Sequence, residues 1–167
     1  MKRDAYISKD EQFRYWLSRI WDDTSPTITF ICLNPSTADS KTDDPTITKC
    51  IKYAKCLGKG GLLMVNLFAY RDTNQSRIWS VEDPIGPEND TWLNKKASKS
   101  SMVIASWGNE GWRFNRSAAV CRLLQSLQCL KVNKSGEPSH PLYLSPDLKP
   151  RPYISGSSKI EGFASVA

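Results

Sequence analysis

Three residues of this sequence have hydrogen-bonding or titratable side chains and lie at or beyond the ends of apolar segments. Asn34 follows the apolar segment 27–33, Asn66 comes near the end of the segment 61–68, and His140 stands in a polar, proline-containing turn. A carboxamide offers both a donor and an acceptor, whereas histidine can give or take a proton near neutral pH. These three side chains are therefore the leading candidates for a working site.

An acidic loop follows the first asparagine and could supply a general base. An asparagine can orient an attacking water but cannot deprotonate it, so a hydrolytic reaction needs a carboxylate nearby. The candidates are Asp39, Asp43 and Asp44, of which we select Asp44. Pro45 comes directly after Asp44, and this pair also predicts a helix that begins with an aspartate cap.

Each leading candidate also has a purely structural interpretation. Asn34 before Pro35 is typical of a turn that ends a strand. Asn66 could bond its own backbone, as asparagines commonly do. A sole histidine such as His140 is often structural, although its place in a loop favours a functional role. Both interpretations stay open for all three residues.

The cysteine and histidine content argues against a metal centre and against a disulfide framework. The five cysteines are an odd number and include no Cys-x-x-Cys pair. With one histidine, a site made of several histidines is excluded by count. We therefore expect reduced, mostly buried thiols and neither a metal nor another cofactor.

The composition is that of one globular domain with a basic balance. Its 167 residues are 40% hydrophobic and 24% charged, and the formal net charge is +6. A positive charge favours contact with phosphates, so nucleic acid is the expected partner, with DNA preferred. The sequence has no long apolar run and no apolar stretch near its start, so we expect a cytoplasmic protein without a membrane partner.

Hydrophobic periodicity predicts that strands and helices alternate along most of the chain. A first helix is expected over residues 8–21, where a capping-box pattern precedes apolar residues on one helical face. Buried strands are expected at residues 27–33, 61–68, 102–107 and 130–132, and further helices at residues 45–57, 86–99 and 120–127. Residues 1–150 are predicted to form one domain, followed by a loosely ordered tail over residues 151–167.

This alternation predicts an α/β fold, a three-layer α/β/α sandwich around a mostly parallel four-stranded sheet. In such sheets ligands bind beyond the carboxyl ends of the strands. Asn34, Asn66 and Trp107 each lie where a predicted strand ends, and His140 follows the last one. Polar residues from distant segments are therefore expected to meet at one edge of the sheet.

Five short motifs in a fixed order resemble DUF1643, a bacterial and phage family of unknown function. They cover residues 33–39, 43–47, 65–71, 86–90 and 140–144. The resemblance extends from about the first strand of the predicted sheet to Leu144. It implies membership of a family but no activity.

A more distant resemblance is to the uracil-DNA glycosylase superfamily. Residues 32–36 are similar to its first motif, which follows the first strand, and residues 140–142 are similar to its second motif. Asn66 stands where several branches place the asparagine that reads a flipped base. The resemblance implies a uracil-DNA glycosylase-like fold and a DNA glycosylase-like hydrolase that excises a damaged or modified base.

Within this resemblance each candidate has a role. Asn34 would orient the water with help from Asp44, and His140 would stabilise the negative charge on the departing base. Asn66 would read the edge of the base. The other substrate-binding candidates in these motifs are Pro35, Ser36, Tyr70, Arg71 and Tyr143.

The sequence also departs from the superfamily's pattern. No aromatic residue follows the first motif closely, the nearest being Tyr53, and Leu142 replaces the small residue of the second motif. The cysteines that bind a cluster in some branches are missing. These departures bear on how a base would be stacked and how the late loop would contact DNA.

Two other classes of function stay open. One is a non-catalytic module that binds nucleotides or single strands by stacking bases on Trp79, Trp92 and Trp112. The other is a hydrolase that uses Ser36 or Cys32 as a nucleophile, with His140 as the distant base.

Overall fold

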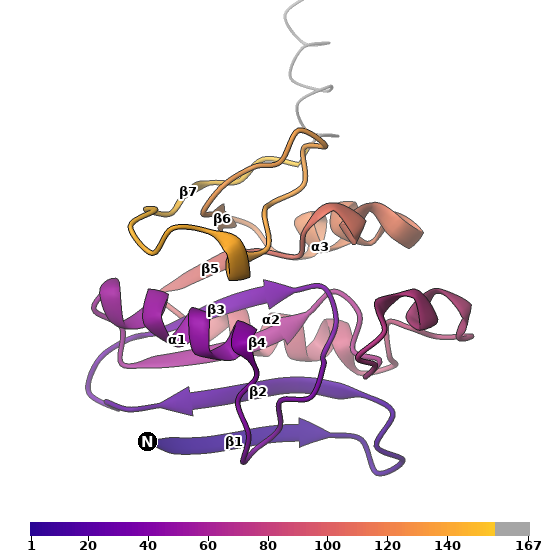
Figure 1. The fold of residues 1–167 in the computed structure, drawn as a ribbon, viewed down its shortest axis with the longest axis horizontal. Coiled ribbons are helices and arrows are strands. Elements are labelled where there is room, and N and C mark those ends of the chain that lie inside the picture. The colour runs from indigo at the N-terminus through magenta and orange to yellow at the C-terminus, as the bar shows by residue number, and fades with distance from the viewer. Residues whose placement is uncertain (156–167) are drawn as a thin grey trace, which may run out of the picture.

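A computed structural model describes residues 1–155 of the chain, and its centre is one seven-stranded sheet (Figure 1). The strands lie in the order β1-β2-β4-β3-β5-β6-β7. They are β1 (Lys2–Ile7), β2 (Arg14–Ile20), β3 (Thr27–Cys32), β4 (Gly61–Asn66), β5 (Met102–Ala105), β6 (Gln128–Cys129) and β7 (Arg151–Pro152). The sheet is therefore wider than the four strands that the sequence predicted.

The sheet is mixed. Its four central strands β4, β3, β5 and β6 run parallel to one another. At one edge β2 pairs antiparallel with both β4 and β1, and at the other edge β7 pairs antiparallel with β6. The α/β class is confirmed, but the expectation of a mostly parallel four-stranded sheet is wrong. Periodicity found the strands that helices separate, whereas the antiparallel strands lie in terminal segments without such a helix.

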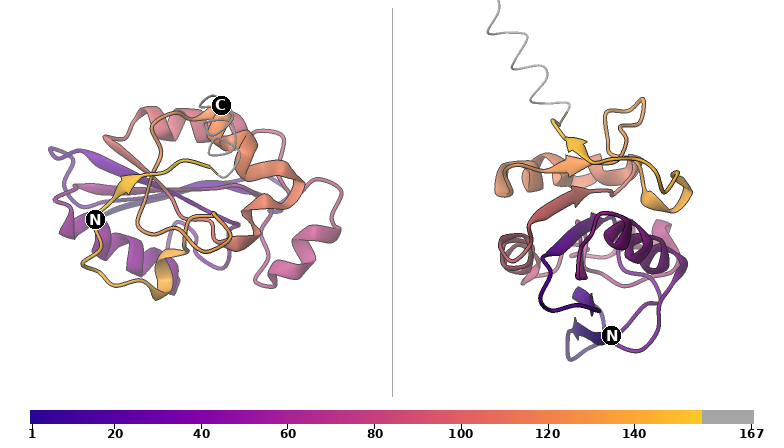
Figure 2. Two further views of the ribbon diagram at one scale, coloured as in Figure 1. Left: turned by 90° about the horizontal axis from the view of Figure 1, so that it is seen from above. Right: turned by 90° about the vertical axis from the view of Figure 1, so that its left-hand side faces the viewer.

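Helices cover both faces of the sheet (Figure 2). On one face lies α1 (Pro45–Cys56), and on the other lie α2 (Asn89–Ser98) and α3 (Arg116–Leu123). Alternate residues of β3 face the two layers, with Phe30 in the cluster under α1 and Ile31 in the cluster under α2 and α3. Three short 3-10 helices lie in the connections, namely η1 (Gln75–Ser80), η2 (Asn109–Asn115) and η3 (Pro141–Tyr143).

The helix expected over residues 8–21 is wrong, because this segment forms the turn and second strand of a β-hairpin. Tyr15, Leu17 and Arg19 are buried at every second position, which is the period of a strand. Aromatic side chains favour strands, and β2 pairs with a neighbour on each side. These pairings outweigh the helical spacing of the apolar residues.

The last parallel strand and the helix before it also lie earlier in the chain than expected. β6 replaces the strand predicted at residues 130–132, and α3 replaces the helix predicted at residues 120–127. Apolar content located both elements only approximately, and pairing with β5 places β6 at Gln128.

The segment after residue 150 contributes to the sheet and to the core. β7 pairs with β6, and the buried Tyr153 ring lies 5.7 Å from that of Trp107, edge to face. Residues 151–155 are thus part of the domain instead of a loose tail. The rest of the predicted tail, residues 156–167, lies outside the described residues.

Candidate functional site

A small cavity of about 40 Å³ lies where β3 and β4 end, and we call it the inner cavity. Its polar lining comes from Arg14, Asn34, Ser36, Asp44, Thr46, Asn66 and His140. The structure therefore brings together the three leading candidates and the selected aspartate, which the sequence separates by more than a hundred residues. The expectation that polar strand ends meet at one edge is met at this cavity.

Asn66 is the last residue of β4, and its side chain has no hydrogen-bond partner in the described part of the chain. The residue is 1% exposed, and neither the Nδ2 nor the Oδ1 atom makes a hydrogen bond within the described residues. Its backbone carbonyl accepts from Asn89 Nδ2 at 3.0 Å, so the strand end is held in place. Leaving a buried polar group unsatisfied costs about 1–3 kcal/mol. The carboxamide is therefore positioned and available for a ligand.

Asn34 holds two loops together with one half of its carboxamide. Its Nδ2 donates to the carbonyls of Pro35 and Asp72, each at 3.0 Å. Its Oδ1 takes part in no hydrogen bond among the described residues, and Asn34 is one of the residues that line the inner cavity. The structural interpretation of Asn34 is thus confirmed for its nitrogen, which fixes the loops, and the role of its oxygen toward a water stays a prediction.

His140 is held in one tautomer by the turn that it caps. Its Nδ1 accepts from the backbone N–H of Leu142 at 3.3 Å, which places the proton of the neutral ring on Nε2. Burial lowers the pKa of His140 below its usual 6.5, and the nearby Asp44 opposes this only in part. At neutral pH the side chain is therefore an uncharged hydrogen-bond donor.

Asp44 caps α1 and also lines the inner cavity. One carboxylate oxygen accepts from the N–H of Ile47 at 2.8 Å, with Pro45 at the first helical position, so the predicted cap is confirmed. Among the described residues, no hydrogen bond or ion pair involves its other oxygen. Asp39 and Asp43 are committed to structure, the first to the backbone of its own loop and the second to Arg19.

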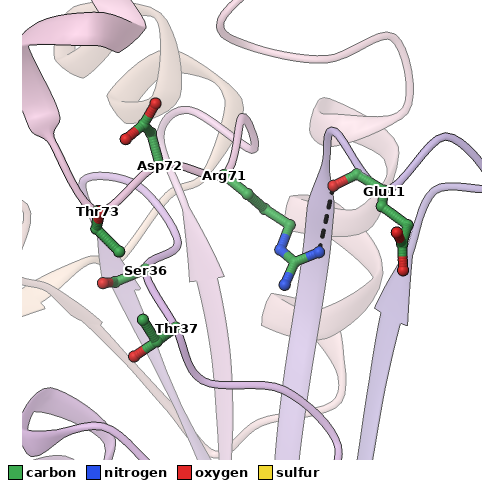
Figure 3. Close-up of a pocket in the computed structure, with 6 residues that line it drawn as sticks. All are labelled: Glu11, Ser36, Thr37, Arg71, Asp72 and Thr73. Carbon is green, nitrogen blue, oxygen red and sulfur yellow. Dashed lines mark hydrogen bonds between the residues drawn. The ribbon is translucent and has the colours of Figure 1, made fainter.

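A larger, open cavity of about 460 Å³ shares the lining residue Ser36 with the inner cavity, and we call it the outer cavity (Figure 3). Arg71 extends along it and donates to the carbonyl of Glu11 at 3.2 Å. Its buried Nε has no partner within the described residues. Arg71 is therefore placed where a phosphate could reach it.

Three further residues predicted to bind substrate line neither cavity. Pro35 serves through its carbonyl, which accepts from Asn34 and from the N–H of Asp72. Tyr70 packs edge to face on Phe13. Tyr143 is 89% exposed on η3. Neither tyrosine is among the cavity lining residues, and their roles as substrate contacts stay predictions.

Arg14 is the site residue that sequence reasoning missed. It is 2% exposed and makes one hydrogen bond, from Nη1 to the carbonyl of Ala38 at 2.6 Å. Its buried Nε has no partner within the described residues. Burial lowers its pKa to about 10, which Asp44 opposes, so the guanidinium stays charged at neutral pH. The alternation of Tyr15 and Leu17 could have placed Arg14 in a strand instead of a helix.

The tryptophans proposed for base stacking differ in access. Trp92 packs on Trp16 and Tyr6, whereas Trp112 is 60% exposed on η2. The Arg113 guanidinium lies 5.2 Å from the Trp112 ring and 4.7 Å from the half-buried Trp79. Of the three, Trp112 alone presents most of its surface to solvent.

A family model described as "Protein of unknown function (DUF1643)" matches residues 14–142. The chain belongs to this family. No curated protein matches the chain, and neither does any solved structure. Within residues 1–155, no helix is long and apolar enough to cross a membrane, and no group of three or more acidic, histidine or cysteine side chains could hold a metal ion.

Proposed function

We propose that this DUF1643 protein takes a nucleobase into the inner cavity and hydrolyses its N-glycosidic bond, as a DNA glycosylase-like enzyme acting on a damaged or modified base. The observation that carries the proposal is the Asn66 carboxamide, buried with its donor and its acceptor both unpaired. The Watson–Crick edge of a base offers a complementary acceptor and donor.

The reaction assigns one task to each side chain of the inner cavity. A water oxygen forms a bond to the anomeric carbon, the carbon–nitrogen bond breaks, and its electron pair leaves with the base. The water loses a proton and the base finally gains one, so the products are a free sugar hydroxyl and a neutral base. Asn34 Oδ1 accepts from the water, Asp44 takes its proton, and His140 Nε2–H donates to the departing base.

The size of the inner cavity adds a requirement. A volume of about 40 Å³ accommodates a few water molecules and not a base. The loops that carry Ser36 and His140 must therefore move apart when a base enters from the outer cavity. The exposed side of this route carries Arg71, and the formal net charge of +6 favours a polyanionic substrate.

The test is single-turnover release of base from oligonucleotides that carry uracil, hypoxanthine, hydroxymethylated cytosine or glucosylated cytosine. We expect release of at least one base, and a loss of about a hundredfold in kcat for His140→Ala with little change in binding. Lys134→Ala, an exposed change six residues earlier, is the matched control and should cleave like wild type. If wild type leaves every base in place, the hydrolytic proposal is abandoned.

A second candidate function is a non-catalytic module that binds single strands. It is favoured by η2, which exposes Trp112 and Phe114 at 60% and 58% and holds Phe114 and Asn115 at positive φ. Binding of single strands that weakens in Trp112→Ala, without release of any base, would support this module over the enzyme.

A further inference from the structure

Arg14 is a buried cation whose hydrogen-bonding capacity is mostly unused. A guanidinium has five N–H donors, and Arg14 makes one hydrogen bond, to the carbonyl of Ala38. The residue is 2% exposed and its Nε is buried without a partner in the described part of the chain. Burying a charge in this way is costly unless something else compensates it.

Two other arginines show how this protein accommodates a buried charge. Arg19 is 0% exposed and donates to Asp43 at 2.7 Å and to three backbone carbonyls. Arg116 is 4% exposed and donates to Asp90 at 2.5 Å and to a backbone carbonyl. Both therefore have a carboxylate partner, whereas no ion pair within residues 1–155 involves Arg14.

The unused donors of Arg14 belong to the same cavity as the other unpaired groups of the site. Asn66 contributes an unpaired amide nitrogen, and His140 contributes the N–H of its Nε2. The cavity's carboxylate, Asp44, already accepts from the first turn of α1. The cavity also holds free acceptors, namely the Oδ1 atoms of Asn34 and Asn66 and the second oxygen of Asp44. None of them pairs with Arg14 within the described residues, so the full positive charge of Arg14 has no hydrogen-bonded anion there.

We propose that the inner cavity is a receptor for negative charge, in which Arg14 binds the anionic edge of a nucleobase. That the ligand is a base rests on the proposed function. Cleavage of an N-glycosidic bond leaves the electron pair on the base, so the first form of the product is an anion. Arg14 is placed to bind this anion, and charge-assisted hydrogen bonds are stronger than neutral ones.

The experiment compares the affinity of two free pyrimidines by calorimetry at neutral pH and low salt. Barbiturate is an anion under these conditions, whereas uracil is neutral. We expect wild type to bind barbiturate about tenfold more tightly than uracil. Arg14→Met should reduce this preference to about twofold or less, and Arg14→Lys should keep part of it, because lysine retains the charge without the planar fork.

The matched control is Lys96→Met. Lys96 is another buried cation, 9% exposed, but it lies on the opposite face of the sheet over the Trp16 ring at 3.4 Å. This variant removes the same unit of charge and should keep the wild-type preference. A loss of preference in Lys96→Met equal to that in Arg14→Met would show an effect of net charge and overturn the proposal.

The outcomes separate this proposal from the hydrolytic one, because free-base binding involves no bond cleavage. Equal wild-type affinities for the two pyrimidines, or no binding of either, overturn the charge receptor even if Arg14→Met does not fold. An Arg14-dependent preference for barbiturate, in a protein that releases no base from any oligonucleotide, supports the receptor and rejects the hydrolase.

Discussion

The two ends of β2 carry buried arginines with opposite surroundings. Arg19, near the carboxyl end, fills its donors with the Asp43 carboxylate and three carbonyls, and so fixes the loop that precedes α1. Arg14, at the other end, is as deeply buried but makes one hydrogen bond and faces the inner cavity. Burial alone therefore does not separate scaffold from site.

What separates them is whether the fold itself satisfies the side chain. A fully paired charge stabilises the structure that pairs it, whereas an unpaired one costs free energy until a ligand arrives. Asn66 belongs with Arg14 in this respect, since neither of its polar atoms has a partner among residues 1–155. Asn34 and His140 are intermediate, because each uses one polar atom for the fold and leaves one for the cavity.

The largest expected effect on stability is at Arg19, the arginine whose guanidinium nitrogens are all paired within the fold. Arg19→Met should lower the free energy of unfolding by about 3–5 kcal/mol, because it leaves two loop carbonyls and part of the Asp43 carboxylate unpaired. Urea denaturation measures this loss. Arg3→Met is the control, since the Arg3–Asp43 pair is more exposed and should contribute about 0–1 kcal/mol. A loss below about 1 kcal/mol for Arg19→Met would contradict a scaffold role for this side chain.

A smaller loss of stability is expected at Asn34, which uses one of its two polar atoms for the fold. Asn34→Asp should destabilise the protein by about 1–3 kcal/mol, because it replaces a donor to two carbonyls with an acceptor that they repel. The matched control is Asn74→Asp. Asn74 caps η1 with its oxygen, which accepts from Ser76, so aspartate keeps that hydrogen bond. Equal urea midpoints for the two variants would contradict the role of Asn34.

Little change in stability is expected at Arg14, whose charge has no ion-pair partner within the described residues. Arg14→Met should alter the free energy of unfolding by less than about 1 kcal/mol, because the lost hydrogen bond to Ala38 is offset by removal of a buried, unpaired charge. Urea denaturation of Arg14→Met and Arg19→Met under the same conditions compares the contributions of the two arginines to the free energy of unfolding. A loss as large as that of Arg19→Met would mean that Arg14 belongs to the scaffold.

The smallest effect concerns pH. Because the pKa of His140 is lowered in the folded protein, the unfolded chain binds its proton first as pH falls. The stability that neutral His140 contributes is thus present above about pH 6.5 and is lost as pH falls through the folded pKa. His140→Asn keeps an acceptor for the Leu142 N–H. Between about pH 7.5 and 5.5, wild type should lose more stability than this variant, and parallel urea midpoints would argue against a buried neutral ring.

Local patterns in the sequence identified much of the site. Asp44 followed by Pro45 predicted the cap of α1, because a cap depends on its own residue and the next turn. Asn34 and Asn66 stood at the ends of predicted strands and His140 in a turn after the last one, and the parallel order of β4, β3, β5 and β6 brings these places together. The strands, the helix cap and these site residues could be predicted from hydrophobic periodicity and from the turn and cap residues that end the segments.

Other features depended on partners that are distant in the chain. The residues of segment 8–21 fit a helical face as well as the alternation of a strand, and pairing with β1 and β4 decides for the strand. Arg14 therefore could not be assigned to the cavity before that pairing was known. The sequence also could not distinguish Arg14, at the site, from Arg19, in the scaffold, because both are arginines of the same segment.

Residue types and local spacing were enough to predict the buried strands β3 and β4, the capped helix α1, the basic charge and the polar residues available to a site. These follow from residue types and from spacing within a few turns of chain. The tertiary structure decided the antiparallel edges of the sheet, the place of Arg14 and which polar atoms stay unpaired. Hydrogen-bond satisfaction is a property of neighbours in space, so it is settled only when all segments are packed.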